Sequence, residues 1–154
     1  MIKKMSALLL SVLFAYTLTA CGSNPELTQF KNEMDSFCTS ISEIDSAING
    51  VDVEADDAVE EVLLLLDKLD SEFQEFAELD FPEEYDYLEE LADESSEYMT
   101  EAVEHYHEAY SNNSYNEYLA EYAQENYSRA YKRVQIIISF LHGEEPTDVD
   151  LTTS

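Results

Sequence analysis

The side chains of this chain that could do chemistry are 35 carboxylates, three histidines and two cysteines. Glu104 and His107 form a Glu-x-x-His pair, a spacing that recurs among the ligands of di-iron helical bundles. Such a site needs two of these motifs and two further glutamates, and this chain has one motif. His105 lies two positions before His107, so the two imidazoles point to different sides of a helix. We therefore expect structural histidines and no bound metal or cofactor.

A second group of acids, Asp52, Glu54, Asp56 and Asp57, is spaced like the start of an EF-hand calcium loop. The loop lacks the glycine at its sixth position, where Asp57 stands, and the acid at its twelfth, where Leu63 stands. This pattern allows weak calcium binding at most. The alternative is that these acids cap the helix that follows.

No set of residues singles out a catalytic centre. The sequence has no glycine-rich phosphate loop, no Cys-x-x-Cys pair and no nucleophile elbow. Cys38 has no basic neighbour in the sequence to activate it, so we expect a small buried hydrophobic side chain there. The formal net charge is −28, which disfavours nucleic acid and anionic lipid as direct ligands. We predict that the protein is not an enzyme.

The elements that hold these side chains are predicted to be helices. Three glycines and three prolines are too few for the turns of a multi-strand β fold. Apolar residues recur every three or four positions, which is the period of one helix face. The first helix is predicted over 25–49: Asn24 caps its start, Pro25 takes its first position, and Asn49-Gly50 ends it.

Three further helices are predicted, over 56–80, 82–111 and 114–142. The second has leucines at 63–65 outside its main apolar stripe, which favours burial by more than one neighbour. Pro82 is predicted to occupy the first position of the third helix, and Gly143 to end the fourth. On these bounds the third and fourth helices outrun the first two, so the turn that joins them would project by ~8 Å.

Short connections make consecutive helices antiparallel. We therefore predict one domain over 25–142, an all-α, up-down-up-down four-helix bundle, followed by a flexible acidic tail over 143–154. The helical stripes predict a single core that includes Phe37, Leu66, Leu69, Leu88, Met99 and Ile137.

The N-terminal 20 residues have the features of an export signal. Lys3 and Lys4 precede a mostly apolar run over 5–20. As a helix this run reaches roughly 24 Å, which is short of the ~30 Å hydrocarbon core of a membrane. The length is typical of a cleaved signal peptide.

The run ends in Leu18-Thr19-Ala20-Cys21, which resembles the lipobox of bacterial lipoproteins at all four positions. The resemblance implies cleavage after Ala20, a diacylglyceryl group on Cys21 and a short tether over 21–24. It also implies a protein anchored to a bacterial membrane through Cys21 and facing outside the cytoplasm. The alternative is an ordinary signal peptide with a chance cysteine after it.

Cleavage at this site would remove two lysines and take the formal charge from −28 to −30. Eleven acids and no Lys or Arg lie in the third predicted helix. Three of the remaining five cations are Arg129, Lys132 and Arg133. Folding the fourth helix back on the third brings these cations level with Asp93, Glu94 and Glu97. Local charge compensation is the prediction, and contact with lipid headgroups is the alternative.

Ten of the eleven tyrosines lie between 85 and 131. Since the lipid anchor would hold the start of the first helix at the membrane, the turn between the third and fourth helices lies far from it. Tyr110, Tyr115 and Tyr118 flank this turn, and we predict that they form a partner-binding surface. They should then be more exposed than Tyr106 and Tyr122. The alternative is that these rings pack in the bundle with their hydroxyls in water.

These features suggest an interaction or accessory module of the cell envelope with an envelope protein as its partner. The alternative is a ligand-binding lipoprotein that uses tyrosine faces for a cell-wall glycan or a small molecule. A deep pocket among the tyrosines would favour the ligand-binding function, and a flat surface would favour the interaction module.

Overall fold

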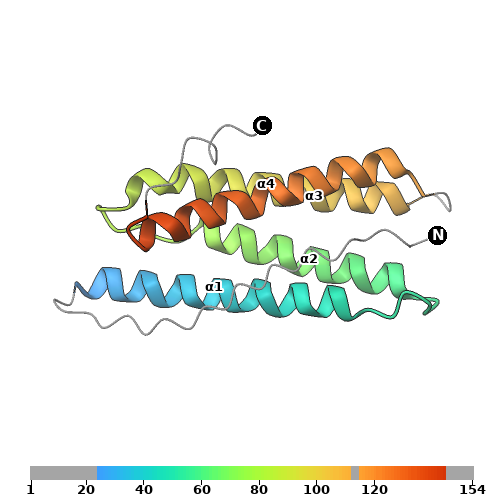
Figure 1. Ribbon diagram of the computed structural model, residues 1–154, viewed down its shortest axis with the longest axis horizontal. Coiled ribbons are helices and arrows are strands. Elements are labelled where there is room, and N and C mark those ends of the chain that lie inside the picture. Colours follow the sequence, from blue (N-terminus) through green and yellow to red (C-terminus); the bar gives the residue numbers. More distant parts are fainter. Residues whose placement is uncertain (1–23, 112–114, 145–154) are drawn as a thin grey trace.

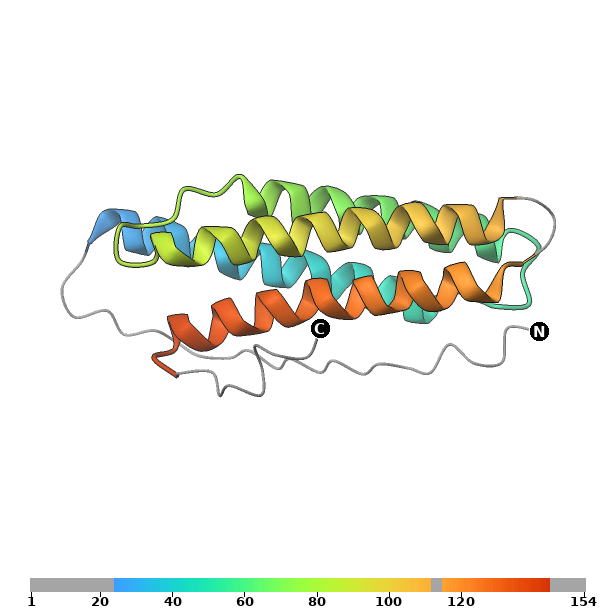
Figure 2. The same cartoon turned by 90° about the horizontal axis from the view of Figure 1, so that it is seen from above.

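The computed structural model describes residues 24–111 and 115–144, and the regular elements in these ranges are all helical (Figure 1). The elements are α1 (Pro25–Gly50), α2 (Ala58–Ala77), the short 3-10 helix η1 (Asp86–Leu88), α3 (Glu89–Tyr110) and α4 (Glu117–Leu141). The four long helices lie side by side along one common direction, and each runs antiparallel to the one before it (Figure 1 and Figure 2). Helix α1 packs on α2, α2 on α3, and α3 on α4. The predicted antiparallel four-helix bundle is confirmed.

The apolar stripes meet in one core. The six residues predicted to lie in it are all buried within a single cluster: Phe37, Leu66, Leu69, Leu88, Met99 and Ile137. The ring of Phe37 stacks on that of Phe76 with centroids 4.3 Å apart, which ties α1 to α2. The fully buried members of the cluster lie between Phe30 and Ile137, so a chain that begins at residue 22 contains all of them.

Local sequence signals set the start of α1 and the end of α4 as predicted. The Asn24 side chain accepts a hydrogen bond from the Glu26 amide at 3.1 Å, and Pro25 takes the first helical position. At the end of α4, Gly143 adopts a left-handed φ of 75°. Its amide donates to the Phe140 carbonyl, and the next amide to the Ser139 carbonyl, both at 2.9 Å. This is the Schellman arrangement, which satisfies carbonyls at a helix end.

The third helix starts later than predicted. Pro82 does not begin α3; it lies in a turn in which the Tyr85 amide donates to the Pro82 carbonyl at 2.6 Å, and α3 begins at Glu89 after η1. The physical reason is packing. The ring of Phe81 lies 4.7 Å from that of Phe30, and the ring of Tyr85 lies 6.4 Å from it. These contacts hold residues 81–85 as a turn over the start of α1.

Other details also differ from the sequence prediction. Helices α2 (Ala58–Ala77) and α4 (Glu117–Leu141) are shorter than the predicted 56–80 and 114–142. Gly50 is the last residue of α1 and has no positive φ; the chain leaves the helix through Val51 in an extended conformation. The third and fourth helices do not outrun the others, since α3 and α4 have 22 and 25 residues against 26 and 20 for α1 and α2. The prediction of a turn that projects through extra helix length is therefore wrong.

The predicted signal peptide, the lipobox cysteine Cys21 and residues 145–154 of the predicted tail lie outside the described residues. Within the described residues, no helix is long and apolar enough to cross a membrane.

Candidate functional site

The histidines act as links between and within helices. The Nε2 atom of His107, on α3, lies 2.6 Å from Oδ1 of Asp67, on α2, and both side chains are about half exposed. The Nδ1 atom of His105 lies 2.6 Å from the Glu101 carbonyl one turn earlier. In residues 24–111 and 115–144, no three His, Cys, Asp or Glu side chains are grouped so as to hold a metal ion.

The acids of the loop between α1 and α2 have mixed roles. The Asp52 carboxylate accepts a hydrogen bond from the Glu54 amide at 3.1 Å, which closes a local turn. Asp57 stands at the cap position of α2, but its side chain makes no capping hydrogen bond. Capping therefore does not account for this acid.

Cys38 is a partly buried member of the apolar face of α1. Burial, with a smaller contribution from Asp35, raises the pKa of its thiol to about 11. The thiol is therefore protonated at neutral pH and is a poor nucleophile.

The three tyrosines around the turn between α3 and α4 differ in exposure. Tyr115 and Tyr118 are 57% and 75% exposed, as predicted. Tyr110 is half-buried, because its ring packs on the core and against the ring of Tyr115 at 5.2 Å. Burial raises the pKa of the Tyr110 phenol.

The two tyrosines predicted to be more buried also differ. Tyr106 is buried, and its hydroxyl donates to the Gln124 side chain at 3.0 Å. Tyr122 is 36% exposed and lies edge-on to His105 with centroids 4.7 Å apart. The predicted ranking is therefore wrong for Tyr110, which is less exposed than Tyr122.

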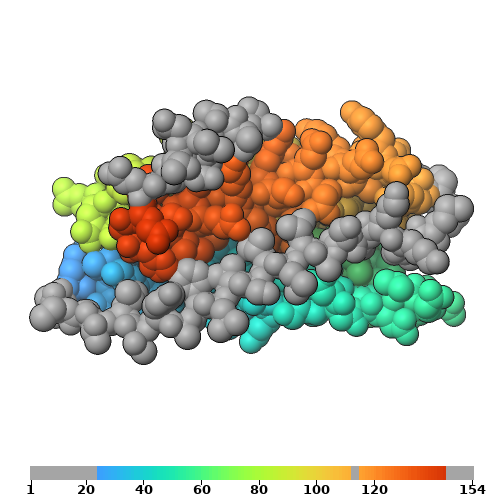
Figure 3. Space-filling model, in the orientation of Figure 1, coloured from blue at the N-terminus to red at the C-terminus, as the bar shows by residue number. Residues whose placement is uncertain are grey.

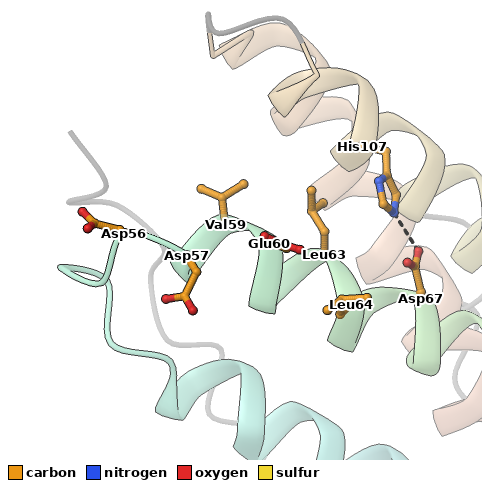
Figure 4. A pocket seen from close by; sticks show the side chains of 8 residues that line it. All are labelled: Asp56, Asp57, Val59, Glu60, Leu63, Leu64, Asp67 and His107. Carbon is orange, nitrogen blue, oxygen red and sulfur yellow. Dashed lines mark hydrogen bonds and ion pairs between the residues drawn. The ribbon is translucent and has the colours of Figure 1, made fainter.

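A groove lies beside the first half of α2 (Figure 4). It has a volume of about 750 Å³, is open to solvent, and is lined by Asp56, Asp57, Val59, Glu60, Leu63, Leu64, Asp67 and His107. Leu64 is 56% exposed, so the prediction that several neighbours bury leucines 63–65 is wrong for this residue. Helix α2 packs on α1 and on α3, and Leu64 lies on the part of its surface that these contacts leave exposed.

The groove and the exposed tyrosines share one end of the bundle. The start of α2, the end of α3 and the start of α4 meet there, at the end opposite the start of α1 (Figure 1). Figure 3 shows the start of α4 and the loop between α1 and α2 at this same end. We call this region the distal end. Tyr115 and Tyr118 therefore lie at the same end of the bundle as the groove, although the α2 residues of the groove are distant from them in sequence.

Arg129 and Arg133 of α4 contact side chains of α3. The Nε atom of Arg133 donates to Oε2 of Glu94 at 2.9 Å. The guanidinium groups of Arg133 and Arg129 lie 4.9 Å and 5.7 Å from the ring centre of Tyr98, close enough for cation–π attraction. The predicted charge compensation is confirmed for Arg133.

Sequence reasoning missed a cluster of Asp45, Tyr127 and Tyr131. The Tyr127 and Tyr131 hydroxyls donate to the two carboxylate oxygens of Asp45 at 2.5 Å and 2.7 Å. Burial raises the pKa of Asp45, and these two hydrogen bonds oppose that rise. Burial and the nearby carboxylate raise the pKa of both phenols, so they remain donors at neutral pH. The spacing of the two tyrosines, one helical turn apart, is the only local signal of this cluster.

No protein-family model, curated protein or solved structure matches this chain.

Proposed function

We propose that this protein is a lipid-anchored module of the bacterial cell envelope that binds a partner protein through its distal end. The lipobox supports the anchoring. Cys21 precedes Pro25 by four residues, so a lipid on Cys21 would hold the start of α1 at the membrane. A helix of 26 residues is ~39 Å long, so the distal end would stand about that far from the anchored end.

The observation that carries the proposal is where the exposed apolar side chains gather. Among the described residues six large hydrophobic side chains are exposed, and five of these lie toward the distal end: Val53, Leu64, Tyr115, Tyr118 and Tyr122. Exposed apolar side chains that gather in one region mark a candidate interaction surface. Tyrosine supplies contact area at a low cost in side-chain entropy.

Binding of a glycan or small molecule at the tyrosines is the second candidate. It would be favoured by a deep pocket among their rings. The groove at the distal end is open, and no tyrosine lines it. Aliphatic and carboxylate side chains line it instead, which favours a protein surface as the ligand.

The distal end is tested by a double change, Tyr115→Ser with Tyr118→Ser, in the host that makes the protein. The unfolding free energy should change by less than about 1 kcal/mol, since both side chains are exposed. Cross-linking to the partner in native membranes should be lost. Tyr87→Ser is the matched control, because Tyr87 is 56% exposed at the opposite end and should leave the partner in place. Retention of every cross-linked protein by the double variant would refute the proposal.

The anchor is tested separately by Cys21→Ser. This variant should accumulate as an uncleaved precursor without lipid. Mass spectrometry of the mature parent protein should find acyl mass on residue 21. A mature N-terminus at another residue, without acyl mass, would contradict anchoring but leave the distal end to be judged by its own test.

A further inference from the structure

The first half of α2 has apolar side chains on its core face and also on a side that the other helices leave exposed. Residues 59–66 contain no glycine, proline or basic residue, and six of the eight are valine or leucine. The five consecutive apolar residues from Val62 to Leu66 cover every side of one helical turn, and a helix that is apolar on every side is ordinarily buried. The bundle buries Leu66 at 4% exposure, leaves Leu63 half-buried and leaves Leu64 56% exposed. One face of this segment therefore has no partner within the described residues.

Carboxylates surround this face. Asp56 and Asp57 lie at one end of the groove, Glu60 lies between Val59 and Leu63 along α2, and Asp67 lies at the other end, where it meets His107 (Figure 4). Val59 and Leu63 project from α2 on the side that faces α3. The groove therefore combines an aliphatic floor with an acidic rim.

The negative charge around the groove limits which kinds of molecule could bind in it. A second copy of this chain would bring a second acidic rim against the first, and the whole chain carries a charge of −28. Anionic lipid headgroups would be repelled in the same way. A segment with apolar side chains on one face and Lys or Arg beside them would satisfy both the floor and the rim.

We propose that this groove binds a basic amphipathic helix of a partner protein. Ten residues of α2, from Ala58 to Asp67, span ~15 Å, which is about three turns of a helix laid along them. Apolar residues three and four apart on the partner would contact Val59, Leu63 and Leu64, and its cations would face the rim. This inference rests on the proposed function and specifies the chemistry of the partner.

The test uses a fluorescent 14-residue peptide of Leu and Lys that forms an amphipathic helix, and residues 22–154 of the protein. Binding is followed by fluorescence anisotropy at physiological salt, where weak surface electrostatics are largely screened. Leu64→Lys should weaken binding at least tenfold. Tyr87→Lys is the matched control, because Tyr87 has the same 56% exposure at the opposite end and the change adds the same charge. It should weaken binding less than twofold.

Two further comparisons separate the groove from general attraction to an acidic protein. A scrambled peptide of the same composition, without an apolar face, should bind at least tenfold more weakly. The pair Asp57→Asn with Glu60→Gln should weaken binding more than Glu83→Gln with Glu84→Gln, which removes the same charge at the opposite end. Equal losses for Leu64→Lys and Tyr87→Lys, or equal binding of the two peptides, would overturn the inference. Circular dichroism confirms that each variant is folded.

A photo-cross-linking amino acid at position 64, 118 or 87 in native membranes keeps this inference distinct from the proposed function. Cross-linking from 118 but not from 64, together with peptide binding that does not depend on Leu64, would overturn the groove and leave the proposed function intact. Cross-linking from neither 64 nor 118 above the level at 87 would refute the proposed function itself.

Discussion

Removing the hydroxyl of Tyr131 should loosen the hold of α4 on α1. The hydrogen bonds from Tyr127 and Tyr131 to Asp45 join these two helices across more than 80 residues of sequence. Tyr131→Phe keeps the ring, which packs edge-on to Phe73 at 5.4 Å. The change therefore removes the hydrogen bond with little loss of packing.

The size of the effect follows from the burial of the two partners. A hydrogen bond to a charged group contributes about 1.5–3 kcal/mol. Tyr131 is buried at 8% exposure, but Asp45 is only partly buried, so water can solvate its carboxylate when the phenol is lost. We therefore expect the lower end, about 1.5 kcal/mol. Tyr127→Phe with Tyr131→Phe leaves the carboxylate without either donor and should cost about 3 kcal/mol.

Urea unfolding of residues 22–154, followed by helical circular dichroism, measures these losses. A loss of 1.5 kcal/mol should lower the melting temperature by about 6 °C for a domain of this size. Tyr118→Phe is the control, because the Tyr118 side chain is 75% exposed, and it should change the free energy by less than about 0.5 kcal/mol.

A double-mutant cycle decides whether the loss comes from Asp45. In the background of Asp45→Ala, Tyr131→Phe should cost at least about 1 kcal/mol less than in the parent. An equal cost in both backgrounds, or no cost in the parent, would refute the role of these hydrogen bonds in joining α1 to α4.

Three further predictions concern stability. Burial raises the pKa of Asp45 above 3.8 in the folded protein. Protonated Asp45 therefore stabilises the fold: this contribution is fully present below the pKa of Asp45 in the unfolded chain, and it is lost as pH rises through the pKa in the folded protein. As pH falls from 7 towards 4, the unfolding free energy of the parent should therefore increase relative to that of Asp45→Asn, measured by urea titration at each pH. A difference between the two proteins that is constant with pH would contradict this. Leu66→Ala removes a side chain that is 4% exposed and should cost ~2–5 kcal/mol by urea unfolding, whereas Leu64→Ala, at 56% exposure, should cost under about 1 kcal/mol. The melting temperature should rise with added salt or millimolar calcium, because ions screen the repulsion between like charges along α3. Pairs four residues apart, such as Glu97 and Glu101, cost a few tenths of a kcal/mol each before screening. Equal melting temperatures at low and physiological ionic strength would count against this reasoning.

Much of the fold is determined by local sequence. The number of helices, their apolar faces and the six predicted core residues follow from a period of three and four residues, which a helix converts directly into one buried face. The start of α1 at Asn24 and the end of α4 at Gly143 depend on hydrogen bonds within one turn of the chain. Such contacts need no knowledge of where the other helices lie.

Contacts between distant residues required the tertiary structure. Phe81 packs on Phe30, which turns residues 81–85 over the start of α1 and delays α3 until Glu89. Asp45 receives its two phenols from α4 because of how the first and last helices sit in the bundle. Periodicity says which face of a helix is apolar, but the rotation and lateral placement of each helix decide which neighbour covers that face. For this reason Leu64, which the sequence predicted to be buried, is exposed in a groove, and Tyr110, which it predicted to be exposed, is half-buried.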